Sequence, residues 1–218
     1  MVKFIIICAT GRSGSTTLQR ILNTIPDSNI CGENDGAIIN ILKFYKNIKK
    51  TITMRPGNQI SLSSEECEKQ NIKPCWYNSF NNDNIIIKIK ELILELFDNK
   101  KNNRVLGCKE IRFIHDDLSL LNDFIELFPE TKIILHYKKD IESQSKSDWF
   151  ALDKNSKDIL LENNTRLLKF YNKSNKDKYY LSSFEEMFDE QFMINIFNFL
   201  SEPFNKDLYL KILSNKLE

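Results

Sequence analysis

A segment near the beginning of the chain has the residue types of an anion-binding loop. The apolar, mostly β-branched run Phe4–Cys8 leads into residues 9–17, Ala-Thr-Gly-Arg-Ser-Gly-Ser-Thr-Thr, and apolar residues at helical spacing follow. In such a strand–loop–helix unit, the backbone N–H groups of the loop and of the first helical turn can bind phosphate. The candidate binding residues are Arg12, Ser13, Gly14, Ser15, Thr16 and Thr17.

The charged residue of this loop is not where a nucleotide-hydrolysing P-loop has it. The Walker motif places a lysine directly after its second glycine, whereas this chain has Ser15 after Gly14. The positive charge here is Arg12, which lies two residues before that glycine. This difference argues against hydrolysis of ATP or GTP and favours another phosphorylated donor.

Four segments have the apolar character of buried strands, and helical periodicity fills the intervals between them. The predicted strands are Lys3–Cys8, Arg104–Lys109, Lys132–Lys138 and Lys178–Ser182. This alternation predicts an α/β fold, a P-loop-like three-layer domain whose central parallel sheet is covered by helices on both faces. Ligands of such sheets bind beyond the carboxyl ends of the strands. We expect residues 1–218 to form a single domain, with an irregular excursion on the substrate side at about residues 51–82.

The charge and composition of the chain disfavour several classes of partner. The net charge of +1 gives no bulk attraction to nucleic acid. No apolar run approaches the ~20 residues that cross a bilayer, and the first residues lack the features of a signal peptide. The five cysteines show no C-x-x-C spacing, so we interpret them as reduced structural thiols. We therefore expect a cytoplasmic protein that binds neither nucleic acid nor membranes, and its oligomeric state stays open.

A second segment has residues that could hold another anion. The predicted strand Lys132–Lys138 is followed by Lys139 and, eight residues later, by Ser147. Taken alone, a lysine and a serine at this spacing are more typical of a solvated helix face than of a binding site.

Together the two segments resemble those of the sulfotransferases that use 3′-phosphoadenosine 5′-phosphosulfate. In this family a loop of the type R/K-S-G-[ST]-T holds the 5′-phosphosulfate, and residues 12–16 match it. An Arg at a strand end, with a Ser eight residues later, holds the 3′-phosphate, and Lys139 with Ser147 matches that pair. The stretch Gly11–Glu33, with Leu18 and the C-G-E of residues 31–33, is most similar to tyrosylprotein sulfotransferases and to bacterial relatives that have G-R-S-G-[ST]-T-L and then C-G-E.

Two residues depart from the family pattern. Lys139 stands where the family has Arg, so the planar fork that binds two phosphate oxygens is replaced by a point charge. Lys138 directly precedes it, which leaves open which of the two lysines binds the 3′-phosphate. Phe184, in a segment that resembles the Y-E-D-L stretch of the family, replaces the common Tyr and lacks its hydroxyl.

The resemblance implies a reaction and a set of catalytic residues. A sulfuryl group would move from 3′-phosphoadenosine 5′-phosphosulfate to an acceptor hydroxyl or amine by in-line displacement, with charge building on the leaving phosphate as in phosphoryl transfer. Cations must stabilise that charge and a base must take the acceptor's proton. Arg12 and Lys109 are the candidate catalytic cations. Peptide tyrosines, glycans and small alcohols all remain possible acceptors.

Glu33 is the first candidate for the base. It is the Glu of the C-G-E pattern, which is the base in tyrosylprotein sulfotransferases. From its position alone, Glu33 could equally be a loop carboxylate that caps the next helix. Glu110 is the second candidate, although a structural Lys109–Glu110 ion pair is an equally good interpretation.

The remaining polar and aromatic residues give weaker indications. No metal is expected, because His115 and His136 are separated in the sequence and no cysteine pair has ligand spacing. His136 lies inside an apolar strand and is interpreted as a core residue. Trp76, Tyr77 and Phe80 either line an acceptor pocket or anchor the excursion to the core.

Two other functions remain open. A P-loop nucleotide kinase or small-molecule kinase uses the same strand–loop–helix unit, but the missing Walker lysine disfavours it. A non-catalytic nucleotide-binding relative would keep the fold without the reaction, and the replacement of Arg by Lys139 keeps this alternative in view.

Overall fold

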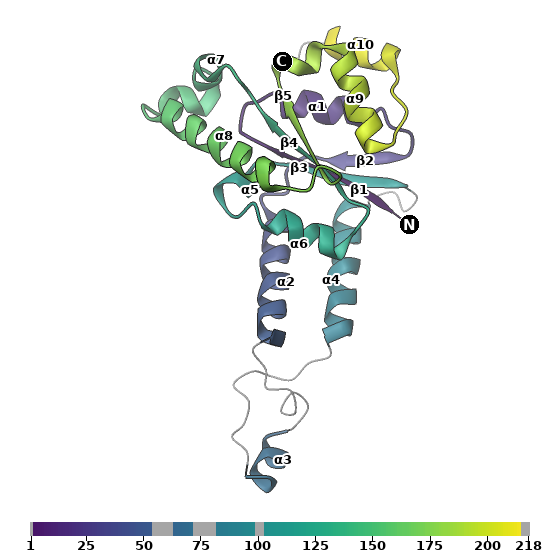
Figure 1. Cartoon of the computed structure of the whole chain (residues 1–218), viewed down its shortest axis with the longest axis vertical. Helices are drawn as coiled ribbons and strands as arrows, with labels where there is room; N and C mark the ends of the chain where they lie inside the picture. The colour runs from purple at the N-terminus through teal and green to yellow at the C-terminus, as the bar shows by residue number, and fades with distance from the viewer. Residues whose placement is uncertain (1, 54–62, 72–81, 99–102, 215–218) are drawn as a thin grey trace.

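A parallel β-sheet forms the centre of the molecule. The computed structural model describes residues 2–53, 63–71, 82–98 and 103–214. Within these residues, five parallel strands form one sheet in the order β2-β3-β1-β4-β5 (Figure 1). The strands are β1 (Lys3–Ala9), β2 (Ser28–Cys31), β3 (Val105–Glu110), β4 (Lys132–Tyr137) and β5 (Tyr179–Ser183).

Four of these strands confirm the sequence prediction, with ends that differ by one residue, and the fifth was missed. β2 has four residues, Ser-Asn-Ile-Cys, and Ile30 is the one among them that is buried. So short a segment, with a single buried apolar side chain, has no recognisable periodicity, and its place is fixed by pairing with β3.

Three helices cover one face of the sheet (Figure 1). They are α1 (Ser15–Leu22), α9 (Glu190–Leu200) and α10 (Lys206–Ser214). Ile5 and Ile7 of β1 point to this face and pack in one cluster with Leu18 of α1 and Ile196 of α9. The apolar stripe of α1, with residues three and four apart, is therefore what fixes the helix against the strand that precedes it.

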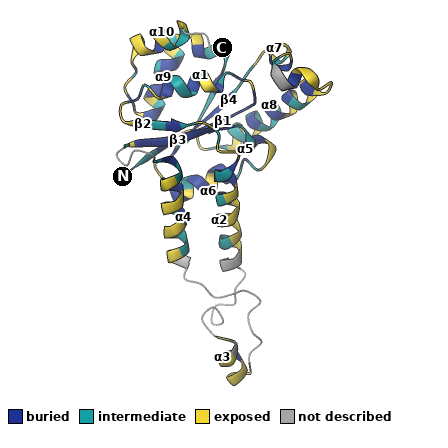
Figure 2. Cartoon of the chain, turned by 180° about the vertical axis from the view of Figure 1, so that it is seen from behind, coloured by how far each residue is buried: buried dark blue, intermediate teal, exposed yellow. Residues whose placement is uncertain are grey.

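The other face of the sheet is covered by a second helical layer. It contains α2 (Ala37–Thr53), α4 (Asn82–Phe97), α5 (Arg112–His115), α6 (Leu120–Leu127) and α8 (Ser156–Lys173). Phe4 and Ile6 of β1 point to this side and pack with Phe124 of α6 and Leu167 of α8. Buried residues concentrate in the sheet between the two layers (Figure 2). The predicted α/β architecture, with helices on both faces of a parallel sheet, is confirmed.

The shorter elements are α3 (Ser64–Lys69), α7 (Ile141–Ser145), η2 (Asp148–Leu152) and η3 (Glu185–Phe188). Most of the excursion expected at residues 51–82, with Trp76, Tyr77 and Phe80, lies outside the described residues. None of the helices in the described ranges is long and apolar enough to cross a membrane.

The register of the strands brings their carboxyl ends to one edge. Because all the pairings are parallel, the loops that follow the strands lie along the same side of the sheet. Ile7 of β1 lies beside Lys109 of β3, and Ala9 lies beside His136 of β4. The loop after β1 therefore starts between the last residues of β3 and β4.

The close approach of β1 and β3 requires a glycine, and Gly107→Ala should strongly destabilise the protein. A Cβ atom at Gly107 would lie 1.8 Å from the carbonyl oxygen of Ile5, so the strands would have to separate. We expect a loss of at least about 1–3 kcal/mol in the free energy of unfolding, as for overpacked cores, measured by denaturant titration. Gly32→Ala is the matched control, because nothing lies within 4 Å of its added Cβ. Equal effects of the two substitutions would contradict this account.

Candidate active site

The loop after β1 has the conformation of an anion cradle. Arg12 and Gly14 both have positive φ angles, 57° and 76°, which turn the chain sharply into α1. The hydroxyl of Ser13 donates to the carbonyl oxygen of Thr10 at 2.6 Å, so this side chain shapes the loop from inside. No side chain caps the first N–H groups of α1, since Gly14 stands at the N-cap. Arg12 and Thr16 beside these N–H groups are exposed, and a helix N-terminus of this kind is suited to anion binding.

A buried histidine supports this loop from below. His136 of β4 is fully buried, with Nε2 2.9 Å from the carbonyl oxygen of Ser13 and Nδ1 3.1 Å from the Ser182 hydroxyl. A carbonyl oxygen only accepts, so Nε2 carries the proton and Nδ1 accepts from Ser182. Burial lowers the pKa of His136 from 6.5 to about 4, which keeps the ring neutral. The interpretation of His136 as a core residue is confirmed, and the ring also fixes the loop.

Two further side chains fix the loop from elements far away in the sequence. Gln144 of α7 is buried, and its amide donates to the carbonyl oxygen of Gly11 at 2.6 Å. Phe184, after β5, lies against Gly14, because a Cβ added to that glycine would be 2.3 Å from the ring. The apolar ring that replaces the common Tyr is thus a packing surface for the loop.

Glu33 and Lys109 form an ion pair at the edge of the sheet beside the loop. Glu33 follows β2 and Lys109 lies near the end of β3, and the lysine ammonium donates to Oε1 of the carboxylate. Oε2 of Glu33 lies 3.1 Å from a guanidinium nitrogen of Arg112. The Glu33 carboxylate therefore contacts Lys109 of the neighbouring strand and Arg112 just after that strand, and it is these cations that orient it.

Glu110 has a different position from the one that the sequence suggested. Its side chain is 1% exposed and pairs with Arg112 at 3.1 Å rather than with Lys109. It also accepts from the backbone N–H groups of Gly36 and Arg112, at 3.2 and 3.0 Å. A carboxylate with both oxygens bonded inside the protein is a structural anchor, which disfavours Glu110 as the base. Sequence analysis assigned no role to Arg112, which follows the candidate residues Lys109 and Glu110 closely in the chain.

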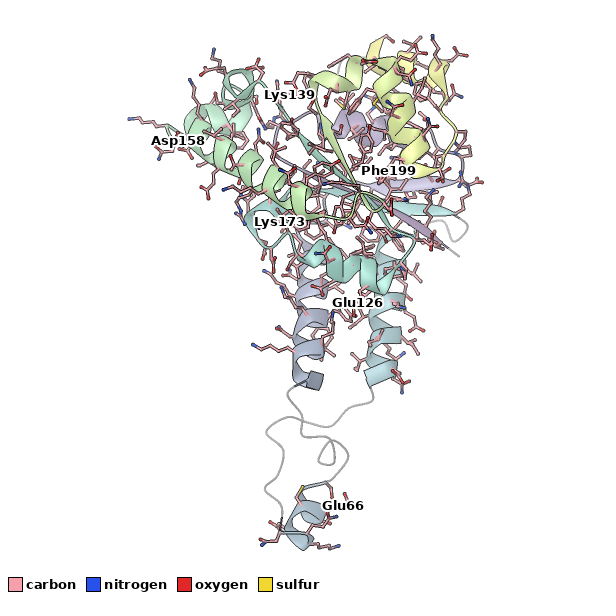
Figure 3. The ribbon with its side chains drawn as sticks, in the orientation of Figure 1. Glu66, Glu126, Lys139, Asp158, Lys173 and Phe199 are labelled. Atoms are coloured by element: carbon pink, nitrogen blue, oxygen red, sulfur yellow. The ribbon has the colours of Figure 1, made fainter. Side chains whose placement is uncertain are left out.

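The structure gives Lys139 and Ser147 separate partners. Lys139 lies between the end of β4 and α7 (Figure 3), and its ammonium pairs with Glu186 of η3 at 3.0 Å. The hydroxyl of Ser147 donates to the carbonyl oxygen of Gln144 at 2.6 Å. The Glu185 carboxylate accepts hydrogen bonds from the backbone N–H groups of Lys139 and Asp140, at 3.0 Å each. A phosphate at this place would therefore have to be bound by side chains, after Lys139 leaves Glu186.

The ion pair of Lys139 and Glu186 keeps both groups charged. The hydrogen bond with Glu186 raises the pKa of Lys139. Partial burial raises the pKa of Glu186, but hydrogen bonds from Ser183 and Lys139 outweigh it, and the pKa is lowered overall. Lys138, the other candidate, donates to the Ser143 hydroxyl at 2.9 Å and lies 4.8 Å from the centre of the Phe184 ring.

Among the described residues, no group of three or more His, Cys, Asp or Glu side chains is placed to hold a metal ion. The described cysteines, Cys8, Cys31, Cys67 and Cys108, are free thiols.

Comparison with known proteins identifies the architecture. No family model matches the chain, and no curated protein matches it. The sulfotransferase domain of the Synechococcus PCC 7002 olefin synthase superposes with a TM-score of 0.56 and 17% identity, over 99% of this chain and 78% of that one. The sulfotransferase domain from the curacin biosynthetic pathway gives 0.52 and 16%, over 95% and 77%. The chain has a sulfotransferase fold. At this identity the sulfotransferase fold is what the likeness shows, so the chemistry rests on the residues above.

The neutral His136 below the loop predicts a loss of stability in mild acid. Because its pKa falls from 6.5 to about 4 on folding, the unfolded chain binds more protons between these values. The free energy of unfolding should therefore decrease as the pH falls from about 6.5 toward 4, with a slope approaching ~1.4 kcal/mol per pH unit. Equilibrium unfolding of the protein and of His136→Gln between about pH 6.5 and 5, above most carboxylate titrations, measures this slope.

The other histidine provides the control for this measurement. Burial also lowers the pKa of His115, so His115→Gln separates its contribution from that of His136. A slope that survives unchanged in His136→Gln would contradict the assignment of a buried neutral ring.

Proposed function

We propose that the protein is a sulfotransferase that moves a sulfuryl group from 3′-phosphoadenosine 5′-phosphosulfate to an acceptor hydroxyl or amine. The observation that most supports this proposal is that two candidate sites lie next to each other at one edge of the sheet, on a sulfotransferase fold. The anion loop with Arg12 follows β1, and the Glu33–Lys109 pair lies at the ends of β2 and β3. A donor held at the first site would present its sulfuryl group to an acceptor deprotonated at the second.

The residues of the loop fit a phosphorylated donor. The uncapped N–H groups of α1 and the left-handed Gly14, whose Cβ position is already filled by the Phe184 ring, leave a backbone surface for phosphate oxygens. When bound, the donor supplies a sulfuryl group attached to a phosphate leaving group. The guanidinium of Arg12 and the N–H groups of residues 14–16 would stabilise the charge that develops on the bridging oxygen. The N–H of Thr17 is excluded because it donates to the carbonyl oxygen of Gly14 at 2.9 Å.

Glu33 would take the proton of the acceptor, and Lys109 couples this transfer to the leaving group. Before the reaction, the lysine charge is balanced by the Glu33 carboxylate. When the carboxylate accepts a proton it no longer balances Lys109, whose charge then acts on the negative charge that grows on the departing phosphate. Removal of the proton and stabilisation of the leaving group are thus linked through one ammonium group.

Lys139 and Ser147 would bind the 3′-phosphate, with Lys138 as the other candidate cation. The acceptor remains open among peptide tyrosines, glycans and small alcohols, and no metal is part of the proposal. A protein that binds 3′-phosphoadenosine 5′-phosphate but never transfers sulfate would instead be the non-catalytic relative.

Glu33→Gln should nearly abolish transfer. Removal of a general base typically lowers the rate by about 10²–10⁴, whereas affinity for 3′-phosphoadenosine 5′-phosphate should stay within a few-fold because Glu33 lies outside the loop. Transfer of label from radiolabelled donor to a panel of phenols, glycans and small alcohols measures the rate, and calorimetry measures the affinity. Glu126→Gln, on α6 (Figure 3), is the control carboxylate. Turnover of Glu33→Gln within a factor of about three of the unmodified protein would place the base elsewhere.

The protein should prefer 3′-phosphoadenosine 5′-phosphate to adenosine 5′-phosphate. One or two charge-assisted hydrogen bonds, at roughly 1.5–3 kcal/mol each, correspond to about 10- to 10⁴-fold, and the low end of this range is expected because lysine offers a point charge. Lys139→Ala and Ser147→Ala should each reduce this preference. Glu186→Gln should raise it by up to about five-fold, since an exposed ion pair worth about 0.2–1 kcal/mol no longer competes.

Calorimetric titration with both nucleotides tests these expectations together. A loss of preference in Lys138→Ala alone would assign the 3′-phosphate to that lysine. Equal affinity of the unmodified protein for the two nucleotides would remove the second phosphate site from the proposal.

A further inference from the structure

Arg112 is surrounded by three carboxylates at the edge of the sheet. One guanidinium nitrogen lies 3.1 Å from Glu33 and also 3.1 Å from Glu110. The other terminal nitrogen lies 2.7 Å from Asp35. A planar guanidinium with five N–H groups can serve several carboxylates at once, which an ammonium group does less well. Arg112 therefore joins the loop that carries Glu33 to the end of β3.

The position of this guanidinium is fixed by a buried anchor. Glu110, the last residue of β3, bonds both the side chain and the backbone N–H of Arg112. The same carboxylate accepts from the backbone N–H of Gly36. A Cβ added to Gly36 would lie 3.2 Å from Cδ of Arg112, so the segment 32–36 packs against the aliphatic part of the arginine. Since Glu110 is buried and belongs to an inner strand of the sheet, the position of the arginine is set by the core of the fold.

Glu33 depends on such contacts because its own segment is irregular. Residues 32–34 belong to neither a helix nor a strand, and the Glu33 side chain is 25% exposed. The carboxylate is oriented by Lys109 at one oxygen and by Arg112 at the other. Without Arg112, the carboxylate could rotate about its remaining contact with the lysine.

The charges of the cluster are compatible with proton acceptance by Glu33. In the described part of the chain, the two cations Lys109 and Arg112 face the three carboxylates of Glu33, Asp35 and Glu110. Because the carboxylates outnumber the cations by one, the cluster keeps a net negative formal charge. The charge of Arg112 is shared among all three carboxylates. Arg112 can thus orient Glu33 without fully neutralising it.

We propose that Arg112 is a positioning residue for the base, which it orients through Oε2. This inference rests on the proposed function, in which the acceptor O–H bond breaks, its proton goes to Glu33, and an oxygen–sulfur bond forms as the donor's bridging bond breaks. Arg112 touches neither donor nor acceptor in this scheme. Its effect on the rate passes through the orientation of the Glu33 carboxylate.

A double-mutant cycle between Arg112→Gln and Glu33→Gln tests this role. Misorientation of a reacting group costs up to about 100-fold in rate, so we expect Arg112→Gln to lower kcat about 10- to 100-fold. The KM of the donor and the affinity for 3′-phosphoadenosine 5′-phosphate should stay within about three-fold. In the Glu33→Gln background, Arg112→Gln should lower kcat by less than a factor of about two, because there is no base left to orient. Arg112→Lys, which keeps the charge without the fork, should recover part of the rate.

Arg104, which flanks the other end of β3, offers a matched control. It precedes β3 and pairs through two nitrogens with the buried carboxylate of Glu202, at 3.0 and 2.6 Å. Arg104→Gln should lower the thermal stability but leave kcat unchanged. Thermal unfolding of every variant separates a folding defect from a rate effect.

The outcomes distinguish the positioning role from the proposed function. If the unmodified protein transfers sulfate but the losses of Arg112→Gln and Glu33→Gln multiply in the double variant, Arg112 does not act through Glu33. If Arg112→Gln weakens nucleotide affinity as much as it lowers kcat, its role is structural. If the unmodified protein transfers sulfate to no acceptor of the panel and not to water, the proposed function fails, and the positioning role fails with it.

Discussion

The position of β1, buried between β3 and β4, determines where the other parts of the candidate site lie. Its residues from Phe4 to Ala9 are at most 1% exposed, and they alternate between the two helical layers. A strand that is apolar on both faces can lie only in the middle of such a sheet. The parallel register then brings Lys109 and His136 to either side of the strand end. The loop after β1 therefore starts between β3, which carries the cation Lys109, and β4, which carries the neutral His136.

Ion pairs within the protein balance three of the cations at this edge, Lys109, Arg112 and Lys139. Lys109 pairs with Glu33, Lys139 with Glu186, and Arg112 with a set of carboxylates. Binding of a donor with several negative charges must therefore exchange protein carboxylates for phosphate or sulfate oxygens. Such exchange lowers the gain in affinity from each cation, but it makes the affinity sensitive to the fit of the ligand. In the proposed reaction the same principle links proton transfer at Glu33 to the charge of Lys109.

The sequence predicted those parts of the site that depend on neighbours along the chain. The apolar run before the loop, the glycines of the loop and the strand–helix alternation are local signals, and the strands and the fold followed from them. Arg112 and Gln144 were given no role because their partners are far away in the sequence. Arg112 bonds Glu33, 79 residues away, and Gln144 bonds Gly11, 133 residues away. Lys139 and Ser147 show the opposite case. The resemblance suggested a joint site, whereas in the structure Lys139 pairs with Glu186 of η3 and Ser147 bonds the carbonyl oxygen of Gln144, three residues before it.

Support and charge are supplied to the anion loop by different residues. The side chains that hold the loop from below, His136, Gln144 and Ser182, are buried and uncharged. Burying an isolated charge is far more costly than burying a hydrogen-bonded neutral group, so a neutral imidazole is the cheaper support. In the proposed function, the charge that faces the donor comes from exposed Arg12. Glu110 is a buried charge beside the candidate site, and it is matched by a guanidinium and two backbone N–H groups. The interior of the fold can therefore stay fixed while the solvent-facing charges exchange partners with a ligand.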